Sequence, residues 1–450
     1  MFLDPLDAKQ ITESVLARSR ADSCTVTVMG GDDANLRFAR NSATTNGARG
    51  TLTVKVASHF GQRSGAASVA GAAGVAGRDD DALAEAVKRS EEIARLAPDN
   101  PETMPPLGPQ TYEAGAAYDE ATVGVRIGRL AAEAKPVIDE AEKRSVDVAG
   151  FSTVGRGFEA LATSAGLFAY DQRTGAQFSV TARNRTGTWS GWAGVADNRF
   201  ARVDASRLGH RAIDKAAAAA EPVRLDPGKY TVILEPSAVS DLVGAMLHNM
   251  NARAADEGRS FFARPGGGNR IGEKLFADNV TIFSDPADPV APEPLFDHDG
   301  VPRRRILWVD GGVLRNLATT RFWARKTDRA PIPPPRTFVM QGGPTSIDDM
   351  IADTKRGVLV TRLWYIRMLD RQKLVLTGLT RDGNFLIENG RVAAPARNFR
   401  FNESPIAMLA NVAAIGATGH TRGGESEDGG VAAPPLLVKD FTFSSVSDAI

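Results

Sequence analysis

The chain has 450 residues, enough for two or three domains with large hydrophobic cores. Its 54 Lys and Arg residues balance its 54 Asp and Glu residues, which argues against a nucleic-acid partner, because binding phosphates requires a basic face. Cys24 is the only cysteine, which excludes an intramolecular disulfide and a thiolate cluster for a metal. No signal-peptide pattern and no apolar stretch long enough to span a bilayer is present. These features predict a soluble, cytoplasmic protein without a membrane partner.

The first half of the chain predicts a mixture of helices and strands. Apolar periodicity and β-branched runs give helices at 6–20, 79–96, 119–144 and 207–220, and strands at 24–29, 36–39, 51–57, 146–151, 159–163, 167–170 and 177–184. We expect a turn at residues 30–33, with the sequence GGDD, and a kink or break near Pro136. The proline-rich residues 98–109 and residues 221–228 are typical of linkers.

The second half predicts mainly strands. These strands are expected at 230–234, 280–283, 304–309, 357–367, 374–381 and 384–388, and short helices at 346–353 and 406–415. Ser346 and Asp349 have the spacing of a capping box. The predicted fold class is α+β, with N-terminal mixed α/β modules followed by a mostly antiparallel β C-terminal domain with a few helices. The predicted domains are 1–97, 110–222 and 226–450.

One helix, entered through Pro236, has the clearest pattern of the chain. Its apolar residues recur at helical spacing and are Val239, Leu242, Val243, Met246, Leu247 and Met250. At 100° per residue, His248 points roughly away from this stripe. The pattern predicts a helix anchored on a core, with an imidazole on its polar face.

His248 raises the question of metal chemistry. A zinc peptidase needs two neutral ligands about one turn apart, and usually an adjacent Glu as general base. Here the base position holds Asn249, and the second ligand position holds Ala252 or Arg253. An amide does not take a proton from water near neutral pH, and a guanidinium repels a dication. We therefore interpret His248 as a solvated or hydrogen-bonded helix residue, with a degenerate metal site as the alternative.

Several longer stretches of the second half carry a family resemblance. They are GKYTVILEP at 228–236, IGEK at 271–274, GGPTSIDDMIADTKRGVLVTRLWY at 342–365, LTGLTRDGNFLIENG at 376–390 and NFRFN at 398–402. In the first half the resemblance is weaker and rests on LRFARN at 36–41 and GQRSG at 61–65. On these stretches the chain resembles the TldD/PmbA family of bacterial proteins.

The resemblance implies a subunit without zinc. The family contains zinc peptidases with a His-Glu-x-x-x-His motif and a further Cys ligand near the C-terminus, and relatives without these residues that pair with a catalytic member. Here His248 is kept, Asn249 and Arg253 replace the Glu and the second His, and residues 416–435 contain no Cys. This departure places the chain with the non-catalytic, PmbA/TldE-like branch, so that zinc is expected in a TldD-like partner subunit.

The resemblance also implies what the subunit contacts. Family partners enclose a cavity that binds an unfolded peptide as an added β-strand. Within the strand at 357–367 we expect peptide or partner contacts from Thr361, Arg362, Trp364 and Tyr365. The amphipathic chemistry of Trp364 and Tyr365 is equally compatible with core positions.

Two other functions stay open. The chain could be a zinc peptidase in its own right, with His248, Asp256 and His420 forming a site of two His and one carboxylate. It could also be a homodimer that binds peptides without cleaving them. We favour the non-catalytic subunit of a heterodimer because Asn249 removes the general base that a zinc-bound water needs.

Overall fold

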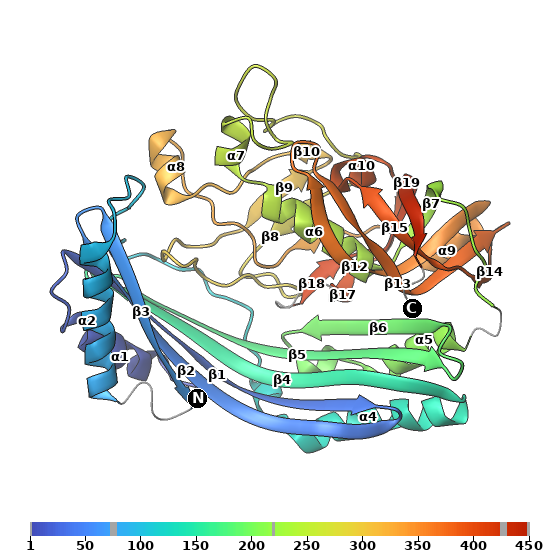
Figure 1. Ribbon diagram of the computed structural model, residues 1–450, viewed down its shortest axis with the longest axis horizontal. Coiled ribbons are helices and arrows are strands. Elements are labelled where there is room, and N and C mark those ends of the chain that lie inside the picture. Colours follow the sequence, from blue (N-terminus) through green and yellow to red (C-terminus); the bar gives the residue numbers. More distant parts are fainter. Residues whose placement is uncertain (1, 73–78, 218–220, 424–429, 448–450) are drawn as a thin grey trace.

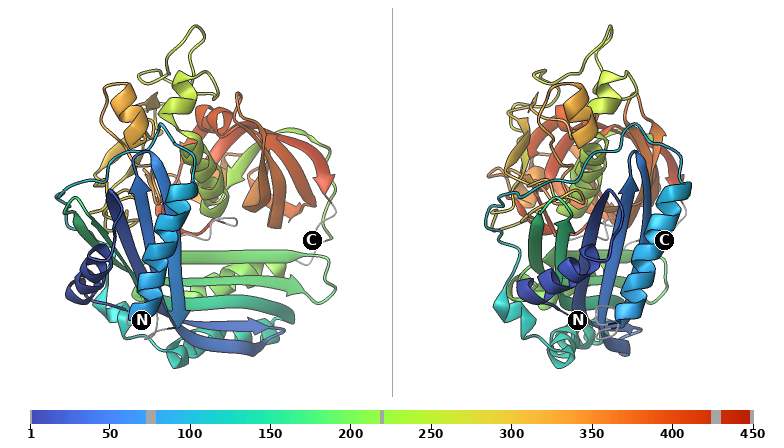
Figure 2. Two further views of the ribbon diagram at one scale, coloured as in Figure 1. Left: turned by 60° about the vertical axis from the view of Figure 1, so that its left-hand side comes forward. Right: turned by 90° about the vertical axis from the view of Figure 1, so that its left-hand side faces the viewer.

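The computed structural model describes residues 2–72, 79–217, 221–423 and 430–447 (Figure 1). A long, curved sheet forms one layer, and the C-terminal half packs against one of its sides (Figures 1 and 2). The fold is mixed α and β with mostly antiparallel sheets, which confirms the predicted class. No helix in these ranges is long and apolar enough to cross a membrane.

Six antiparallel strands form the first sheet, in the order β3-β2-β1-β4-β5-β6. They are β1 (Ser23–Ala39), β2 (Ser42–Phe60), β3 (Arg63–Ala72), β4 (Val146–Thr163), β5 (Phe168–Asn184) and β6 (Ser190–Asp197). Strand β1 pairs with β2 on one side and with β4 on the other. The segments expected as subdomains 1–97 and 110–222 therefore contribute to one sheet, and residues 98–109 connect two parts of it.

Strand β1 is continuous through residues 30–33, so the predicted turn there is wrong. Backbone partners in both β2 and β4 hold this segment extended. Gly31 permits the close approach to β4, since a Cβ there would lie 2.4 Å from the Arg156 carbonyl oxygen. Strands β4 and β5 also run unbroken where four shorter strands were predicted, because they pair with each other along almost their whole length.

Helices cover one face of this sheet (Figure 1). They are α1 (Pro5–Leu16), α2 (Asp80–Leu96), α3 (Glu120–Val123), α4 (Ile127–Lys143), the 3₁₀ helix η1 (Phe200–Arg202) and α5 (Ala205–Ala216). Buried apolar residues of β1 at 26, 28, 36 and 38 point to these helices. Because side chains alternate along a strand, the odd-numbered positions point to the C-terminal half.

The helical stretch at 119–144 is broken at 124–126, between α3 and α4, and α4 continues through Pro136. The predicted position of the break is therefore wrong. Pro136 cannot donate to the carbonyl of Ala132, but both residues lie on the exposed side of α4. Water can hydrate this carbonyl, which explains how the helix tolerates the proline.

The C-terminal half contains a small barrel. Its strands are β7 (Gly228–Leu234), β12 (Arg356–Asp370), β13 (Val375–Glu388), β15 (Asn398–Glu403) and β19 (Leu436–Ser447), with β14 (Arg391–Pro395) and β16 (Val412–Ile415) attached. The order β12-β7-β19-β15-β13 closes on itself because β12 also pairs with β13. Only the β12–β7 pair is parallel among these pairings of described residues.

A second sheet lies beside the barrel, in the order β10-β9-β8-β11-β18-β17. Its strands are β8 (Ile282–Ser284), β9 (Ile306–Asp310), β10 (Val313–Leu314), β11 (Val339–Met340), β17 (Gly419–Thr421) and β18 (Val431–Ala433). The helices of this half are α6 (Pro236–Asn249), α7 (Ala252–Asp256), α8 (Arg321–Lys326), α9 (Ile347–Ala352) and α10 (Pro405–Ala410). The capping box at Ser346 is confirmed. The helix predicted at 406–415 ends at Ala410, and β16 takes up the remaining residues.

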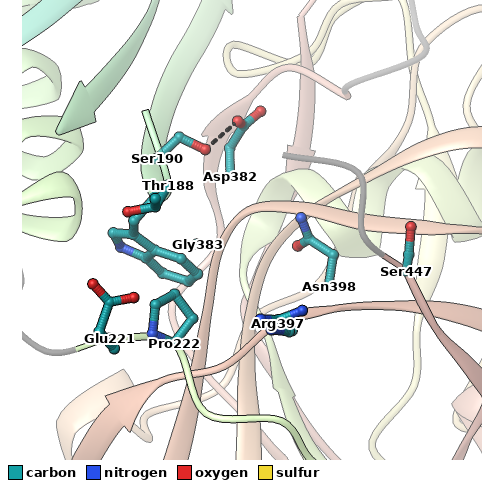
Figure 3. A pocket seen from close by; sticks show the side chains of 10 residues that line it. Thr188, Ser190, Glu221, Pro222, Asp382, Gly383, Arg397, Asn398 and Ser447 are labelled. Atoms are coloured by element: carbon teal, nitrogen blue, oxygen red, sulfur yellow. Dashed lines mark hydrogen bonds between the residues drawn. The ribbon is translucent and has the colours of Figure 1, made fainter. Parts of the chain in front are cut away.

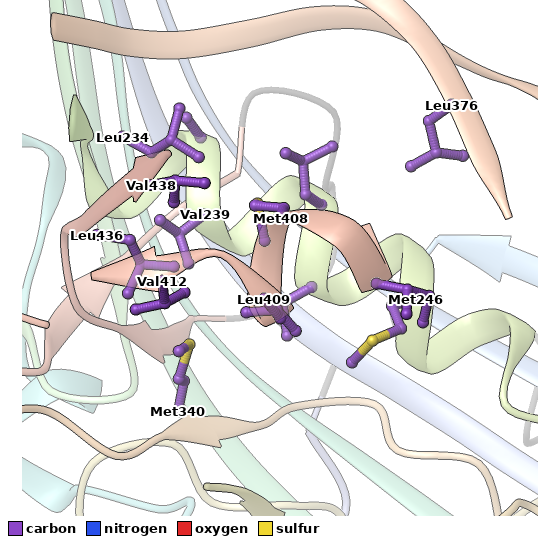
Figure 4. Packing of buried hydrophobic residues seen from close by; sticks show 14 of the residues in the cluster. Leu234, Val239, Met246, Met340, Leu376, Met408, Leu409, Val412, Leu436 and Val438 are labelled. Atoms are coloured by element: carbon purple, nitrogen blue, oxygen red, sulfur yellow. The ribbon is translucent and has the colours of Figure 1, made fainter. Parts of the chain in front are cut away.

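Helix α6 lies in the core between the barrel and the second sheet (Figure 4). Every residue of its predicted apolar stripe is at most 3% exposed. Burying each such side chain stabilises the fold by about 1.5–3 kcal/mol. The helix is thereby fixed in place, and so is the direction in which its polar residues point.

Candidate functional site

Helix α6 presents His248 to solvent near its C-terminal end. The next residue, Asn249, lies at the position of the general base in the family motif. Its side-chain amide donates a hydrogen bond of 2.8 Å to the carbonyl oxygen of Ala245. An amide held in this way offers no basic lone pair to a bound water.

Arg253 lies beyond the end of α6, on the short helix α7. Its guanidinium is 2.8 Å from a carboxylate oxygen of Glu102 and 3.0 Å from one of Glu257. It also lies over the ring of Trp323, 5.4 Å from the centroid. Hydrogen bonds to Glu102 and Glu257 raise the pKa of Arg253. The residue at the second ligand position is therefore a protonated cation, which does not fit a zinc ion.

Asp256, a candidate zinc ligand, uses its carboxylate for other contacts. One oxygen accepts from the indole N–H of Trp323 at 2.8 Å and from Arg329 at 2.9 Å. The other oxygen accepts from the amide of Asn269 at 2.7 Å. This carboxylate therefore links α7 to α8, through Trp323, and to the loops that contain Asn269 and Arg329.

His420, the remaining candidate ligand, lies on β17 next to the first sheet. Its Nδ1 is 2.8 Å from a carboxylate oxygen of Asp197, close enough for an ion pair but not aligned as a hydrogen bond. The described ranges contain no group of three or more His, Cys, Asp or Glu side chains placed to hold a metal ion. The structure thus does not bring His248, Asp256 and His420 together, and the alternative zinc site predicted from them is not formed.

A buried charge cluster joins α5 to the N-terminal end of α6. Lys215 Nζ lies 2.7 Å from one carboxylate oxygen of Glu235 and 2.9 Å from the hydroxyl of Thr361. Arg211 lies 2.8 Å from the same carboxylate. Burial is the main cause that lowers the pKa of Lys215 to about 8, although Glu235 opposes the shift. We call Arg211, Lys215, Glu235 and Thr361 the Glu235 cluster.

A second buried carboxylate, Asp382, lies nearby on β13. It accepts a hydrogen bond of 2.7 Å from Ser190 of the first sheet and one of 2.8 Å from Nε of Arg362 on β12. Ser190 and Asp382 border a pocket of about 180 Å³, whose wall is formed in part by Trp189 and Pro222 (Figure 3). Together with the Glu235 cluster, this contact links the first sheet to the barrel.

The largest of the described cavities lies between the first sheet and the C-terminal half, with a volume of about 660 Å³. We call it the interlayer cleft. Residues of β1, β4 and β5 form its floor, and these include the glycines Gly31, Gly155, Gly157 and Gly175. Asp171 also lines it, and burial raises the pKa of this carboxyl group to about 6. Segments near Pro292 and Thr337 form the opposite wall.

The four contact residues predicted on β12 differ in their surroundings. Thr361 is fully buried in the Glu235 cluster, and Arg362 is engaged with Asp382. Trp364 and Tyr365 are 37% and 53% exposed, which shows that they are not core residues. Arg362 and Arg381 lie over the Trp364 ring. The exposed part of β12 is therefore an aromatic and arginine-rich surface toward the turn of the β12–β13 hairpin.

Two family profiles match most of the chain. The PmbA/TldA metallopeptidase central domain matches residues 119–220, and the PmbA/TldA metallopeptidase C-terminal domain matches residues 227–445. The chain belongs to this family. The TldD/PmbA resemblance predicted from the sequence is thereby confirmed.

Relatives agree with membership in the PmbA/TldA family. A protein from Methanothermobacter thermautotrophicus described as a metalloprotease is 24% identical over 238 residues, which are 48% of this chain and 49% of that protein. The chain thus spans about half the length of this curated relative. The crystal structure of TldE from Thermococcus kodakarensis has a TM-score of 0.84 at 17% identity, covering 97% of this chain and all of that one. A structure from Thermotoga maritima has a TM-score of 0.81 at 16% identity, with the same coverage. These two structural similarities show that the fold is shared.

The sequence did not predict the roles of three buried charged residues. Lys215, Asp382 and Asp171 gave no specific signal, because Lys215 lies in a predicted helix and the two aspartates each follow directly after a predicted strand. Their roles arise from partners 20 or more residues away, such as Glu235 for Lys215 and Ser190 for Asp382. Only the three-dimensional pairing identifies them.

Proposed function

We propose that this chain is the non-catalytic subunit of a dimeric metallopeptidase complex, in which a TldD-like partner binds the zinc. The observation that carries this proposal is the Arg253 guanidinium, held by Glu102 and Glu257 at the second ligand position of the family motif. Asn249, with its amide bound to the helix, adds to this argument because it cannot serve as general base. Both side chains make contacts within this chain.

We further propose that the interlayer cleft contributes to a chamber for unfolded peptides. Its volume of about 660 Å³ is in the usual range for ligand sites. At Gly157 and Gly175 the floor has no side chain, and an added Cβ at Gly175 would meet nothing within 4 Å, so an extended peptide can lie close to the backbone there. Recognition of this kind depends on main-chain contacts, which suits peptides of differing sequence.

The exposed part of β12 is the proposed contact with the partner. Trp364, Tyr365 and Leu369 are all more than a third exposed and lie on one strand. Tyr365 has a left-handed backbone with φ of 56°, which is uncommon for an aromatic residue. Strained residues of this kind concentrate at functional positions. Large aromatic side chains beside arginines are also the residues that most often dominate protein interfaces.

Zinc content distinguishes this proposal from a self-sufficient peptidase. The purified chain is dialysed against metal-free buffer and analysed by elemental mass spectrometry, alone and as a complex with a co-expressed TldD-like paralogue. We expect no stoichiometric zinc in the chain alone, and peptide cleavage only in the complex. About one zinc per chain that is lost in His248→Ala would overturn the proposal. His210→Ala is the matched control, since His210 is an exposed histidine on α5.

Replacing Trp364 tests the proposed contact surface. Trp364→Ala should weaken binding of the partner or of a peptide about tenfold or more, because truncating a central interface Trp typically costs at least 2 kcal/mol. Leu96→Ala is the control, since this exposed apolar residue lies on α2 in the other layer. Surface plasmon resonance measures both variants. Equal affinity of the Trp364 variant and the unchanged chain would mean that the partner binds elsewhere.

A further inference from the structure

Another cavity lies between the end of the 98–109 linker and the second sheet of the C-terminal half, with a volume of about 470 Å³. This volume is within the range of small-molecule sites, about 300–1,000 Å³. Glu293 lines this cavity, whereas its neighbours Pro292 and Pro294 line the interlayer cleft. The two cavities are therefore separate and share a wall that is one extended segment thick.

Most of the cavity wall is apolar and stiff. Leu107 comes from the linker, Ile306 from β9, and Pro331, Ile332 and Pro333 from one proline-rich segment. Prolines have a fixed φ and little freedom to lose when a ligand binds. The cavity is therefore preorganised for an apolar group.

The buried charges at this cavity satisfy each other. Arg303 and Glu293, both less than a tenth exposed, form an ion pair of 2.9 Å. Arg303 also donates to the carbonyl oxygens of Phe296 and Pro334. The other oxygen of Glu293 accepts from the backbone N–H groups of Arg336 and Thr337, each at 2.7 Å. This pair is neutral overall and has no need of a ligand.

Two further arginines give the lining an excess of positive charge. Arg304 is exposed, and its side chain has no hydrogen-bond or ion-pair partner among the described residues. Arg321 has a side chain that is 11% exposed, and its contacts are the Pro105 carbonyl oxygen at 2.6 Å and Asp299 at 4.0 Å. A guanidinium has five donors, so Arg321 keeps several for a ligand. Glu293 is the only acidic residue of the lining.

We propose that this cavity binds a small apolar carboxylate. The apolar part packs against Ile306, Ile332 and the adjacent prolines, and the carboxylate pairs with Arg304, supported by the charge of Arg321. Arg–carboxylate pairs are among the strongest hydrogen-bonded contacts in proteins. A free apolar acid and the C-terminal residue of a peptide share this chemistry. The inference is independent of the interlayer cleft and of any partner subunit.

Ligand-observed NMR titration of the full chain with N-acetylleucine tests the proposal. We expect saturable binding, and at least tenfold weaker binding of the methyl ester, which lacks the charge. Arg304→Ala should weaken binding of the acid roughly tenfold to a hundredfold. Arg305→Ala is the matched control and should bind normally, because Arg305 pairs with Asp285 and does not line the cavity.

A variant that fills the cavity tests the proposal without changing the charge of the lining. Ala330 is exposed and lines the cavity, so Ala330→Trp should fill it without disturbing the core and should abolish binding. Equal affinity for the acid and the ester, normal binding by Arg304→Ala, or no binding at about 10 mM acid would each overturn the proposal. A leucine-terminated tripeptide that binds more tightly than N-acetylleucine would assign the site to peptide C-termini. Weaker binding of the tripeptide would assign it to free acids.

Discussion

Two charge clusters flank helix α6, and they differ mainly in burial. At its N-terminal end, the side chains of Glu235 and Lys215 are 7% and 11% exposed. Just past its C-terminal end, those of Arg253 and Glu102 are 35% and 40% exposed. Burial lowers the pKa of Lys215, whereas hydrogen bonds raise the pKa of Arg253. The same pairing of a cation with a glutamate therefore costs desolvation energy at one end and little at the other.

The largest expected effect is at the buried cluster. Glu235→Gln leaves Lys215 and Arg211 without their carboxylate, so we expect a loss of about 3–5 kcal/mol in the free energy of unfolding. Urea denaturation at pH 7 measures it. Glu257→Gln removes a more exposed carboxylate from Arg253 and should cost far less, because solvent screens this pair. Similar losses in the two variants would show that burial does not separate the clusters.

Lys215 of the buried cluster should make the free energy of unfolding depend on pH. Lys215 has a pKa of about 8 in the folded chain and 10.5 as its ordinary value. Between these pH values the unfolded chain binds more protons, so the free energy of unfolding should rise with pH. The slope from this group is at most about 1.4 kcal/mol per pH unit. The contribution is lost as the pH falls through about 8.

Lys215→Met isolates this contribution, because it removes the titrating group and keeps a side chain of similar length. The free energy of unfolding of the unchanged chain, relative to that of the variant, should increase from pH 8 to pH 10.5. Chemical denaturation at several pH values measures it. A difference that stays constant over this range would mean that Lys215 keeps its proton throughout.

The sequence predicted those parts of the fold that depend on neighbouring residues. The apolar stripe of α6 and the capping box of α9 are local patterns, and both occur in the structure. Helix α2 also begins and ends close to its predicted bounds. Strand lengths were predicted poorly, because residues 30–33 favour a turn locally and are extended only by pairing with β2 and β4. Tertiary contacts override local preference at such positions.

Prediction of the candidate site had the same limit. The replacement of a base by Asn249 and of a ligand by Arg253 is visible in the sequence, because it depends on spacing along the chain. The Glu102 carboxylate that holds Arg253 is not predicted, since it lies in a linker 151 residues away. Thr361 was expected to contact a peptide or partner, but it is buried beside Lys215. Its contact with Lys215, 146 residues earlier in the chain, depends on how α5 packs against the barrel and has no counterpart in the strand pattern.

The smallest expected effect is the coupling within the exposed cluster. A double-mutant cycle of Arg253→Ala and Glu102→Ala should give a coupling energy close to zero, because solvent screens both groups. The linker keeps other tethers in either variant, such as the hydrogen bond of 2.7 Å from Thr163 to the Leu107 carbonyl oxygen. The matching cycle of Lys215→Met and Glu235→Gln should give a coupling energy several times larger. Equal coupling in the two cycles would contradict this distinction, because it would mean that the linker holds Glu102 as rigidly against Arg253 as the core holds Glu235 against Lys215.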